Sequence, residues 1–214
     1  MHPTSSATDR TYHFTKDAIL SRRYAGGELI SEGDIAADVG VSRTPVREAL
    51  LRLQAEGLVR LYPKRGALVV PVSQQEVDDV IETRRLVEGF TAERAAAAPA
   101  ERRRELVARL DALLERMAEL VPTDRRGVVL ADREFHRTIV SAAGNEILTA
   151  LYESLRDRQL RMMEEGSRTV ERMRRNIEDH GVIRAAIESG DGERARAAVH
   201  AHIDAAAELL GARR

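Results

Sequence analysis

The stretch VSRTPVREALLRLQAEGLV, residues 41–59, decides the fold of the N-terminal part of the chain. Four apolar residues in it recur at the i, i+3, i+4, i+7 spacing of a helix that buries one face: Val46, Ala49, Leu50 and Leu53. Pro45 is compatible with the first turn, where a missing backbone N–H costs nothing. We therefore expect a helix from about residue 42 or 44 to residue 56.

The segments around this helix complete a small domain. SEGDIAADVG, residues 31–40, predicts a two-turn helix capped by Ser31 and ended by Gly40. Before it, residues 12–24 have helical spacing, whereas residues 1–10 are polar and are expected to form a loose arm. After it, LVRLYPKRGALVV, residues 58–70, predicts a hairpin with a basic tip. Three helices and a hairpin predict a winged helix-turn-helix domain over residues 1–72.

Polar and basic residues of this domain are candidates for DNA binding. Four of them lie at the start of the third helix: Ser42, Arg43, Thr44 and Arg47. Arg52 lies later in the same helix, and Lys64, Arg65 and Gly66 lie in the predicted hairpin. A recognition helix places its N-terminal residues nearest the bases, and arginine reads guanine through two hydrogen bonds. A surface helix with solvated arginines explains any one of them, but not their combination with the short helix and the basic hairpin.

Residues 73–214 predict a second, all-helical domain. SQQE, residues 73–76, has the pattern of a capping box, which begins a long helix. Five further segments with helical spacing follow, and no segment alternates as a strand does. We therefore expect a mainly α protein, with an antiparallel bundle of about six helices after the winged helix-turn-helix.

The composition narrows the class of protein. The chain has no cysteine, which excludes disulfides and thiolate metal sites, and its net charge is −1. No apolar run reaches the roughly 18 residues of a membrane helix, and the first residues do not resemble a signal peptide. We expect a soluble, cytoplasmic protein without a membrane partner.

The bundle sequence contains a candidate metal site. Asp132 and His136 are four residues apart, hence on one helix face, and His180 and His202 lie on later helices at core-like positions. Three histidines and a carboxylate that converge could bind a metal ion and leave coordination positions open. The alternative is that each histidine is an ordinary core residue, which is the commoner case for any single one.

The N-terminal domain also resembles a known family. Residues 29–70, with the VSRTPVREAL block, the EGLV turn and the RG pair of the hairpin, look like the DNA-binding domain of GntR-type bacterial transcription regulators. The resemblance implies that Arg43, Thr44 and Arg47 contact DNA. It also implies that Gly66 lets the hairpin tip approach the minor groove.

The second domain is similar to the FCD ligand-binding domain of the FadR subfamily of these regulators. That resemblance implies a divalent metal on Asp132, His136, His180 and His202: zinc by ligand preference, with manganese and nickel as alternatives. It also implies that an arginine of the first bundle helix pairs with the carboxylate of a small organic acid. The R-x3-E motif selects Arg84 with Glu88, although Arg85 is adjacent, and Asn145 is a further effector-binding candidate.

Together these features predict a homodimeric transcription regulator that is not an enzyme. We expect it to bind a palindromic DNA operator, to act as a repressor, and to respond to a metal-bound carboxylate. One alternative is a metal-dependent hydrolase that uses the Asp/His site to activate water. Another is a winged-helix protein whose bundle is structural only.

Overall fold

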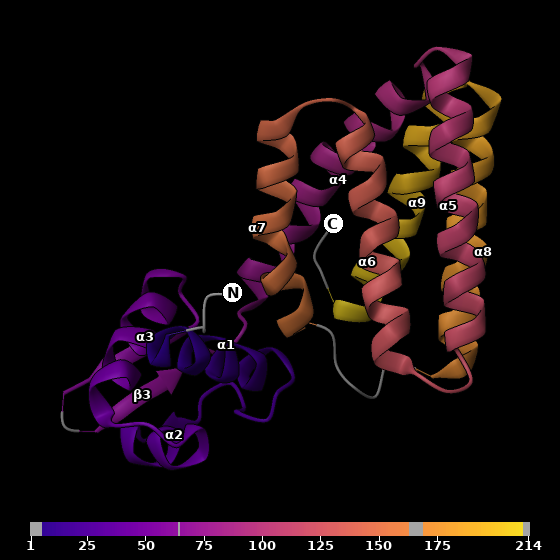
Figure 1. The fold of residues 1–214 in the computed structure, drawn as a ribbon. Coiled ribbons are helices and arrows are strands. Elements are labelled where there is room, and N and C mark those ends of the chain that lie inside the picture. The colour runs from indigo at the N-terminus through magenta and orange to yellow at the C-terminus, as the bar shows by residue number, and fades with distance from the viewer. Residues whose placement is uncertain (1–5, 64, 163–168, 212–214) are drawn as a thin grey trace. The chain divides into compact units, whose positions relative to one another are not determined.

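The computed structural model describes residues 6–63, 65–162 and 169–211 of the chain (Figure 1). The chain divides into two compact units, residues 1–73 and 74–214, which we call the N-terminal and the C-terminal unit. Within the described ranges it forms nine helices and three short strands, so the protein is mainly α, as predicted. None of the helices in these ranges is long and apolar enough to cross a membrane.

The N-terminal unit contains the three predicted helices: α1 (Ala7–Leu20), α2 (Glu32–Val39) and α3 (Arg43–Ala55). The hydroxyl of Ser31 accepts a hydrogen bond from the backbone N–H of Asp34 at 3.0 Å, which starts α2. Gly40, with φ of 70°, ends it. On α3, the four apolar residues from Val46 to Leu53 are fully buried, so the predicted inward face is confirmed.

Helix α1 differs from its prediction. It begins at Ala7, where we expected a loose arm, and ends at Leu20. In its N-terminal half the buried residues carry hydroxyl groups (Thr11, Tyr12 and Thr15), and the apolar Ala18 and Ile19 are buried only near its end. The Tyr12 hydroxyl donates to Glu56 at 2.7 Å, which ties α1 to the end of α3. Threonine hydroxyls in the first turns give no apolar periodicity there, and for this reason the sequence pattern placed the start of α1 too late.

The hairpin is part of a three-stranded antiparallel sheet. Strands β2 (Val59–Tyr62) and β3 (Gly66–Val69) form the predicted hairpin. A third strand, β1 (Leu29–Ile30), pairs with the other edge of β3, so the order is β1-β3-β2. Sequence reasoning missed β1, because two residues are too short for a recognisable alternation.

Gly66 has a structural role within this sheet. Its φ is 107°, and a Cβ atom built on it would lie 2.2 Å from the carbonyl oxygen of Ile30. Side chains avoid both this backbone conformation and this approach. The close approach of β1 is therefore a sufficient reason for a glycine at this position, whether or not the residue also lies near DNA.

We expect Gly66→Ala to lower the free energy of unfolding by ~1–3 kcal/mol, because the sheet must open at β1 to admit the methyl group. Urea denaturation measures the loss. Gly57→Ala is the matched control, since Gly57 also has a positive φ of 74° but faces open space. Equal losses in the two variants would rule out the steric contact with β1.

The C-terminal unit is a bundle of six helices within its described residues: α4 (Gln74–Ala96), α5 (Ala100–Leu120), α6 (Arg125–Ala142), α7 (Glu146–Met162), α8 (Val170–Ser189) and α9 (Gly192–Leu210) (Figure 1). Helix α4 packs along α9 and α6, α5 packs along α6 and α8, and α7 covers α4 and α6. Capping side chains of Asp124, Thr169 and Asp191 begin α6, α8 and α9. These contacts bring α6, α8 and α9 together around the site described next.

Candidate functional site

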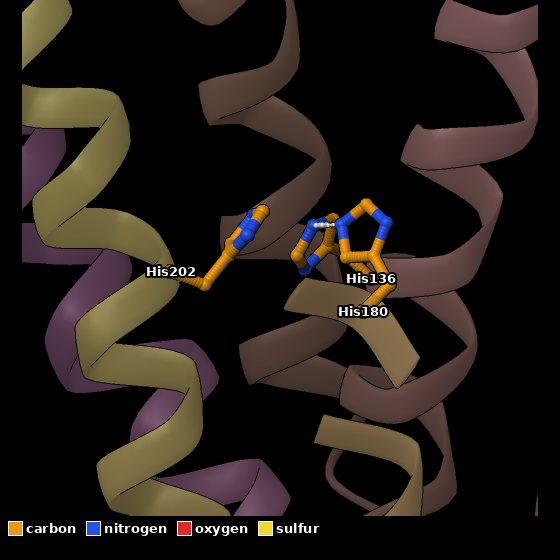
Figure 2. A group of neighbouring side chains, drawn as sticks. All are labelled: His136, His180 and His202. Atoms are coloured by element: carbon orange, nitrogen blue, oxygen red, sulfur yellow. Dashed lines mark hydrogen bonds between the residues drawn. The ribbon is translucent and has the colours of Figure 1, made fainter. Parts of the chain in front are cut away.

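Three imidazole rings from three helices meet inside the C-terminal unit. They belong to His136 of α6, His180 of α8 and His202 of α9, and they point toward one another (Figure 2). One ring nitrogen from each lies within 4.8 Å of the nitrogens of the other two, and the ring centroids are 4.6 to 4.9 Å apart. All three side chains are buried. The group can offer three nitrogen ligands to a single metal ion.

A buried carboxylate on α4 orients one of these rings. Glu88 Oε2 lies 2.9 Å from Nδ1 of His136, while Glu88 Oε1 accepts a hydrogen bond from Nε of Arg84 at 2.6 Å. Burial by itself would raise the pKa of Glu88, but Arg84 and His136 outweigh it and lower the pKa to about 2. The ionised carboxylate accepts a hydrogen bond from Nδ1–H of His136, so the other ring nitrogen, Nε2, is the one that faces His180.

The other two histidines are held in the neutral form. Burial, reinforced by the neighbouring histidines, keeps the pKa values of His180 and His202 well below the usual value for histidine. Nε2 of His180 lies 3.0 Å from Nε2 of His136, and Nδ1 of both His180 and His202 has no hydrogen-bond partner in the described chain. Buried polar atoms rarely lack partners, and neutral imidazoles are metal ligands. These residues therefore fit a divalent metal.

Asp132 lies next to the three histidines without being one of the closely grouped ligands. Its Oδ1 is 3.5 Å from Nε2 of His180, and it accepts a hydrogen bond from Nδ2 of Asn176 at 2.7 Å. The side chain retains 28% of its exposure, whereas the histidines are almost fully covered. Asp132 thus lies beside the histidines and, like His136 and His202, lines the cavity next to them.

This cavity has a volume of about 120 Å³. Its polar wall includes Arg84, Asp132, Arg133, Gln159, Asn176 and His202, and apolar side chains of α4, α6, α7 and α9 form the rest. Arg84 uses Nε and Nη2 to bind Glu88, and Nη1 has no partner among the described residues. Nε2 of Gln159 is buried and also without a partner there. The cavity thus offers unused hydrogen-bond donors beside three potential metal ligands.

The structure separates the effector candidates. Arg84 lines the cavity, whereas Arg85 forms an ion pair with Asp204 and does not line it. Asn145 is also absent from the wall, because its Oδ1 accepts the backbone N–H groups of residues 147 and 148 at the start of α7. His200 lies on α9 with its Nε2 3.2 Å from the carbonyl oxygen of Arg85 and is not one of the three clustered histidines. Residues two positions apart on a helix point about 200° apart, which separates His200 from His202.

On α3, the candidate DNA-binding residues of the first two turns are accessible. Ser42, Arg43, Thr44 and Arg47 are all exposed. Ser42 precedes the helix, and its hydroxyl makes no capping bond. Arg47 keeps 68% of its side-chain exposure while it pairs with Glu32 of α2 at 2.8 Å. This pair lies on the surface, where such contacts are weak and exchange readily for a phosphate or a base.

The remaining DNA-binding candidates have different positions. Arg52 lies over the ring of Tyr12, 4.1 Å from its centroid, and pairs with Asp9, so both of these contacts are with α1. Its side chain retains 46% of its exposure. Arg65 is exposed beside the turn between β2 and β3. Lys64 lies outside the described residues.

Sequence reasoning missed several polar residues of the cavity, among them Arg133, Asn176 and Gln159. Asn176 is four residues before His180 on α8, so helical spacing alone could have placed both on one face. Gln159 is seven residues after Tyr152 on α7, and the same argument applies to this pair. Neither residue belongs to a motif, and this is why neither was identified.

The chain matches two protein families. Residues 79–205 match the FCD domain, and residues 7–69 match the gntR family of bacterial regulatory proteins. The FCD match alone covers more than half of the chain.

Individual relatives agree with these matches. An HTH-type transcriptional regulator of Agrobacterium vitis is 38% identical over 133 residues, which cover 62% of this chain and 78% of the relative. The gluconate operon transcriptional repressor of Bacillus licheniformis is 32% identical over 139 residues, 64% of this chain and 56% of the repressor. A solved GntR regulator from Rhodococcus sp. RHA1 has a TM-score of 0.76, with 26% identity over 97% of this chain and 99% of that one.

Proposed function

The chain belongs to the GntR family of bacterial transcriptional regulators with an FCD domain, and from this premise we propose that it is a repressor controlled by a metal-bound organic acid. One observation carries the proposal: two of the three clustered histidines, His136 and His202, line the same cavity as Arg84. A metal and a guanidinium that face one small cavity select an anion. Because the family and the relatives are transcriptional regulators, the hydrolase alternative is set aside.

We propose that His136, His180 and His202 hold the metal, with Asp132 as a further ligand. The histidine set suits zinc, and manganese and nickel remain compatible with nitrogen and oxygen ligands. A bound divalent ion would supply positive charge for a carboxylate oxygen of the effector. Glu88 fixes the orientation of His136, as carboxylates commonly do for metal-bound histidines.

The proposed effector is a small hydroxylated carboxylic acid. The free Nη1 of Arg84 can donate to its carboxylate, and the unpartnered Nε2 of Gln159 can donate to a hydroxyl oxygen. The relative from Bacillus licheniformis is named for the gluconate operon, and gluconate is an acid of this class.

For the N-terminal unit we propose that α3 enters the major groove of the operator, with Arg43, Thr44 and Arg47 at the bases and phosphates. Two copies of the chain would read two half-sites of a palindrome in the cytoplasm. Effector binding would lower operator affinity by a coupling free energy of ~1–3 kcal/mol, which corresponds to about 5 to 150-fold.

Selection of the purified protein on random duplex DNA, at one stated salt concentration and with and without a chelator, tests this function. We expect enrichment of a short palindrome, and weaker binding to it when gluconate-like acids are added to the metal-loaded protein. Enrichment of no sequence under either condition would contradict operator recognition. If a palindrome were enriched but its binding did not respond to acids or to chelator, the proposed effector sensing would be contradicted and the DNA-binding function would stand.

Replacing Arg47 by alanine should weaken binding to the selected operator by ~1–3 kcal/mol, because a base contact is lost while the fold stays intact. Fluorescence anisotropy with operator and with random duplex measures the loss of preference. Arg52→Ala is the control: its side chain is held by Tyr12 and Asp9, so its loss should reduce stability and leave sequence preference unchanged. Unchanged operator affinity in Arg47→Ala would remove Arg47 from the readout.

A further inference from the structure

We propose that the exposed face of α4 is the dimer interface, and that two copies of α4 meet there antiparallel about a two-fold axis. This inference rests on the homodimer of the proposed function and adds its surface and register. Four residues at intervals of four form a stripe along the helix: Glu82, Leu86, Phe90 and Arg94. We call them the α4 stripe. All four are exposed, although much of the rest of α4 is buried in the bundle.

The centre of the α4 stripe is apolar. Leu86 retains 67% and Phe90 retains 49% of their exposure, on a helix that is otherwise well packed against α6, α7 and α9. Two large apolar side chains one turn apart are neighbours on a helix surface. Contiguous exposed apolar groups on a soluble protein mark an interaction site more often than isolated ones do.

The neighbouring helix α7 also carries exposed apolar residues. Ile147 and Leu151, also one turn apart, retain 80% and 41% of their exposure. Helices α4 and α7 touch through a small cluster in which Val87 packs with Tyr152 and Leu148. A stable interface buries roughly 800 Å² per partner, more than two side chains of one helix supply. The α7 residues provide the additional apolar area.

The charges at the ends of the stripe favour a second copy of this chain as the partner. Glu82 lies one turn before Leu86, and Arg94 lies one turn after Phe90. Neither has an ion-pair partner within the ranges that the structure describes. With a two-fold axis midway between Leu86 and Phe90, Glu82 meets the partner's Arg94 and Arg94 meets the partner's Glu82, while Leu86 meets the partner's Phe90. The stripe is thus complementary to itself, as an isologous interface requires.

The same pattern excludes a parallel arrangement. Two parallel helices in register would place Glu82 against the partner's Glu82 and Arg94 against the partner's Arg94. Like charges at an interface reduce affinity and suppress the wrong register. The stripe therefore specifies direction as well as location.

Analytical ultracentrifugation of the full chain tests the location. We expect Leu86→Asp combined with Phe90→Asp to raise the dimer dissociation constant by roughly 100-fold or more, because four charges enter an apolar interface. Val182→Asp is the matched control, since Val182 on α8 retains 56% of its exposure and lies on neither α4 nor α7. It should leave the dimer unchanged. Circular dichroism and urea denaturation check that each variant folds.

A charge exchange tests the register. Glu82→Arg alone and Arg94→Glu alone should each raise the dimer dissociation constant roughly tenfold, because the two-fold axis doubles each like-charge contact. The double variant Glu82→Arg with Arg94→Glu should restore dimerisation to within a few-fold of the parent. A monomeric parent chain would remove the homodimer itself. A dimeric parent with a dimeric Leu86→Asp, Phe90→Asp variant would overturn only the interface, and a double charge variant as weak as the single ones would overturn the antiparallel pairing.

Discussion

Replacing Glu88 by alanine is expected to lower the free energy of unfolding of the metal-free C-terminal unit by ~3–5 kcal/mol. Glu88 is 2% exposed and accepts hydrogen bonds from Arg84 and His136. Without it, the Arg84 guanidinium, itself 11% exposed, would be left as an uncompensated charge. Breaking a buried pair on one side costs far more than the pair contributes when whole, because the remaining charge stays desolvated.

Urea denaturation in the presence of a chelator, followed by circular dichroism, measures this loss. Glu93→Ala is the matched control on the same helix, because Glu93 pairs with Arg196 at 3.2 Å but both side chains are about half exposed. A surface pair of this kind should cost at most ~1 kcal/mol. If the two variants lost the same stability, the buried network would have no special role. In the metal-loaded protein, Glu88→Ala should also weaken metal binding by ~10–100-fold, because His136 loses its orienting partner.

Elements with an apolar face could be predicted from the sequence. Helix α3 is the example: Val46, Ala49, Leu50 and Leu53 are spaced so that only a helix buries all four, and all four are buried. Capping residues and glycines then indicated where the neighbouring helices begin and end, as Ser31 and Gly40 do for α2. The periodicity of apolar residues carries this information because burial of apolar area is the main driving force for packing.

Faces that are buried through polar contacts could not be predicted in this way. Thr11 and Thr15 of α1 are buried although their side chains resemble those of an exposed segment, so the start of α1 was misjudged. The contacts of Arg52 with Tyr12 and Asp9 were likewise not visible in the local pattern. Such positions are decided by partners that are distant in sequence, and a local pattern does not contain them.

The candidate site shows the same division. Spacing placed His136, His180 and His202 on inward stripes, and the structure brings these three together. Spacing alone did not decide between Arg84 and Arg85, because adjacent helical residues point about 100° apart and the orientation of α4 was unknown. The packing of α4 against α6 and α9 settles which arginine lines the cavity.

Replacing His180 by alanine should weaken zinc binding by more than ~100-fold. Removing a residue that only hydrogen-bonds to a metal ligand typically lowers metal affinity by ~10–100-fold. His180 is itself a proposed ligand, and its ring nitrogen lies buried within 4.8 Å of the nitrogens of the other two histidines, so its loss should cost more. Operator binding without effector should be retained, because His180 belongs to the C-terminal unit and the DNA-binding candidates belong to the N-terminal unit. Response to the effector should be lost, since the carboxylate loses the cation that would bind it.

His200→Ala is the control that separates a ligand from a nearby histidine. His200 lies on α9 two residues before His202, but it is bound to the carbonyl oxygen of Arg85 and not to the cluster. Zinc titration with a competing chelator, and anisotropy with operator and effector, should therefore give parental values for His200→Ala and a double loss for His180→Ala. Parental zinc affinity in His180→Ala would overturn the metal assignment. If His180→Ala lost zinc affinity but kept its response to the effector, the metal assignment would stand but the metal would have only a structural role. The acid would then bind through Arg84 without the metal.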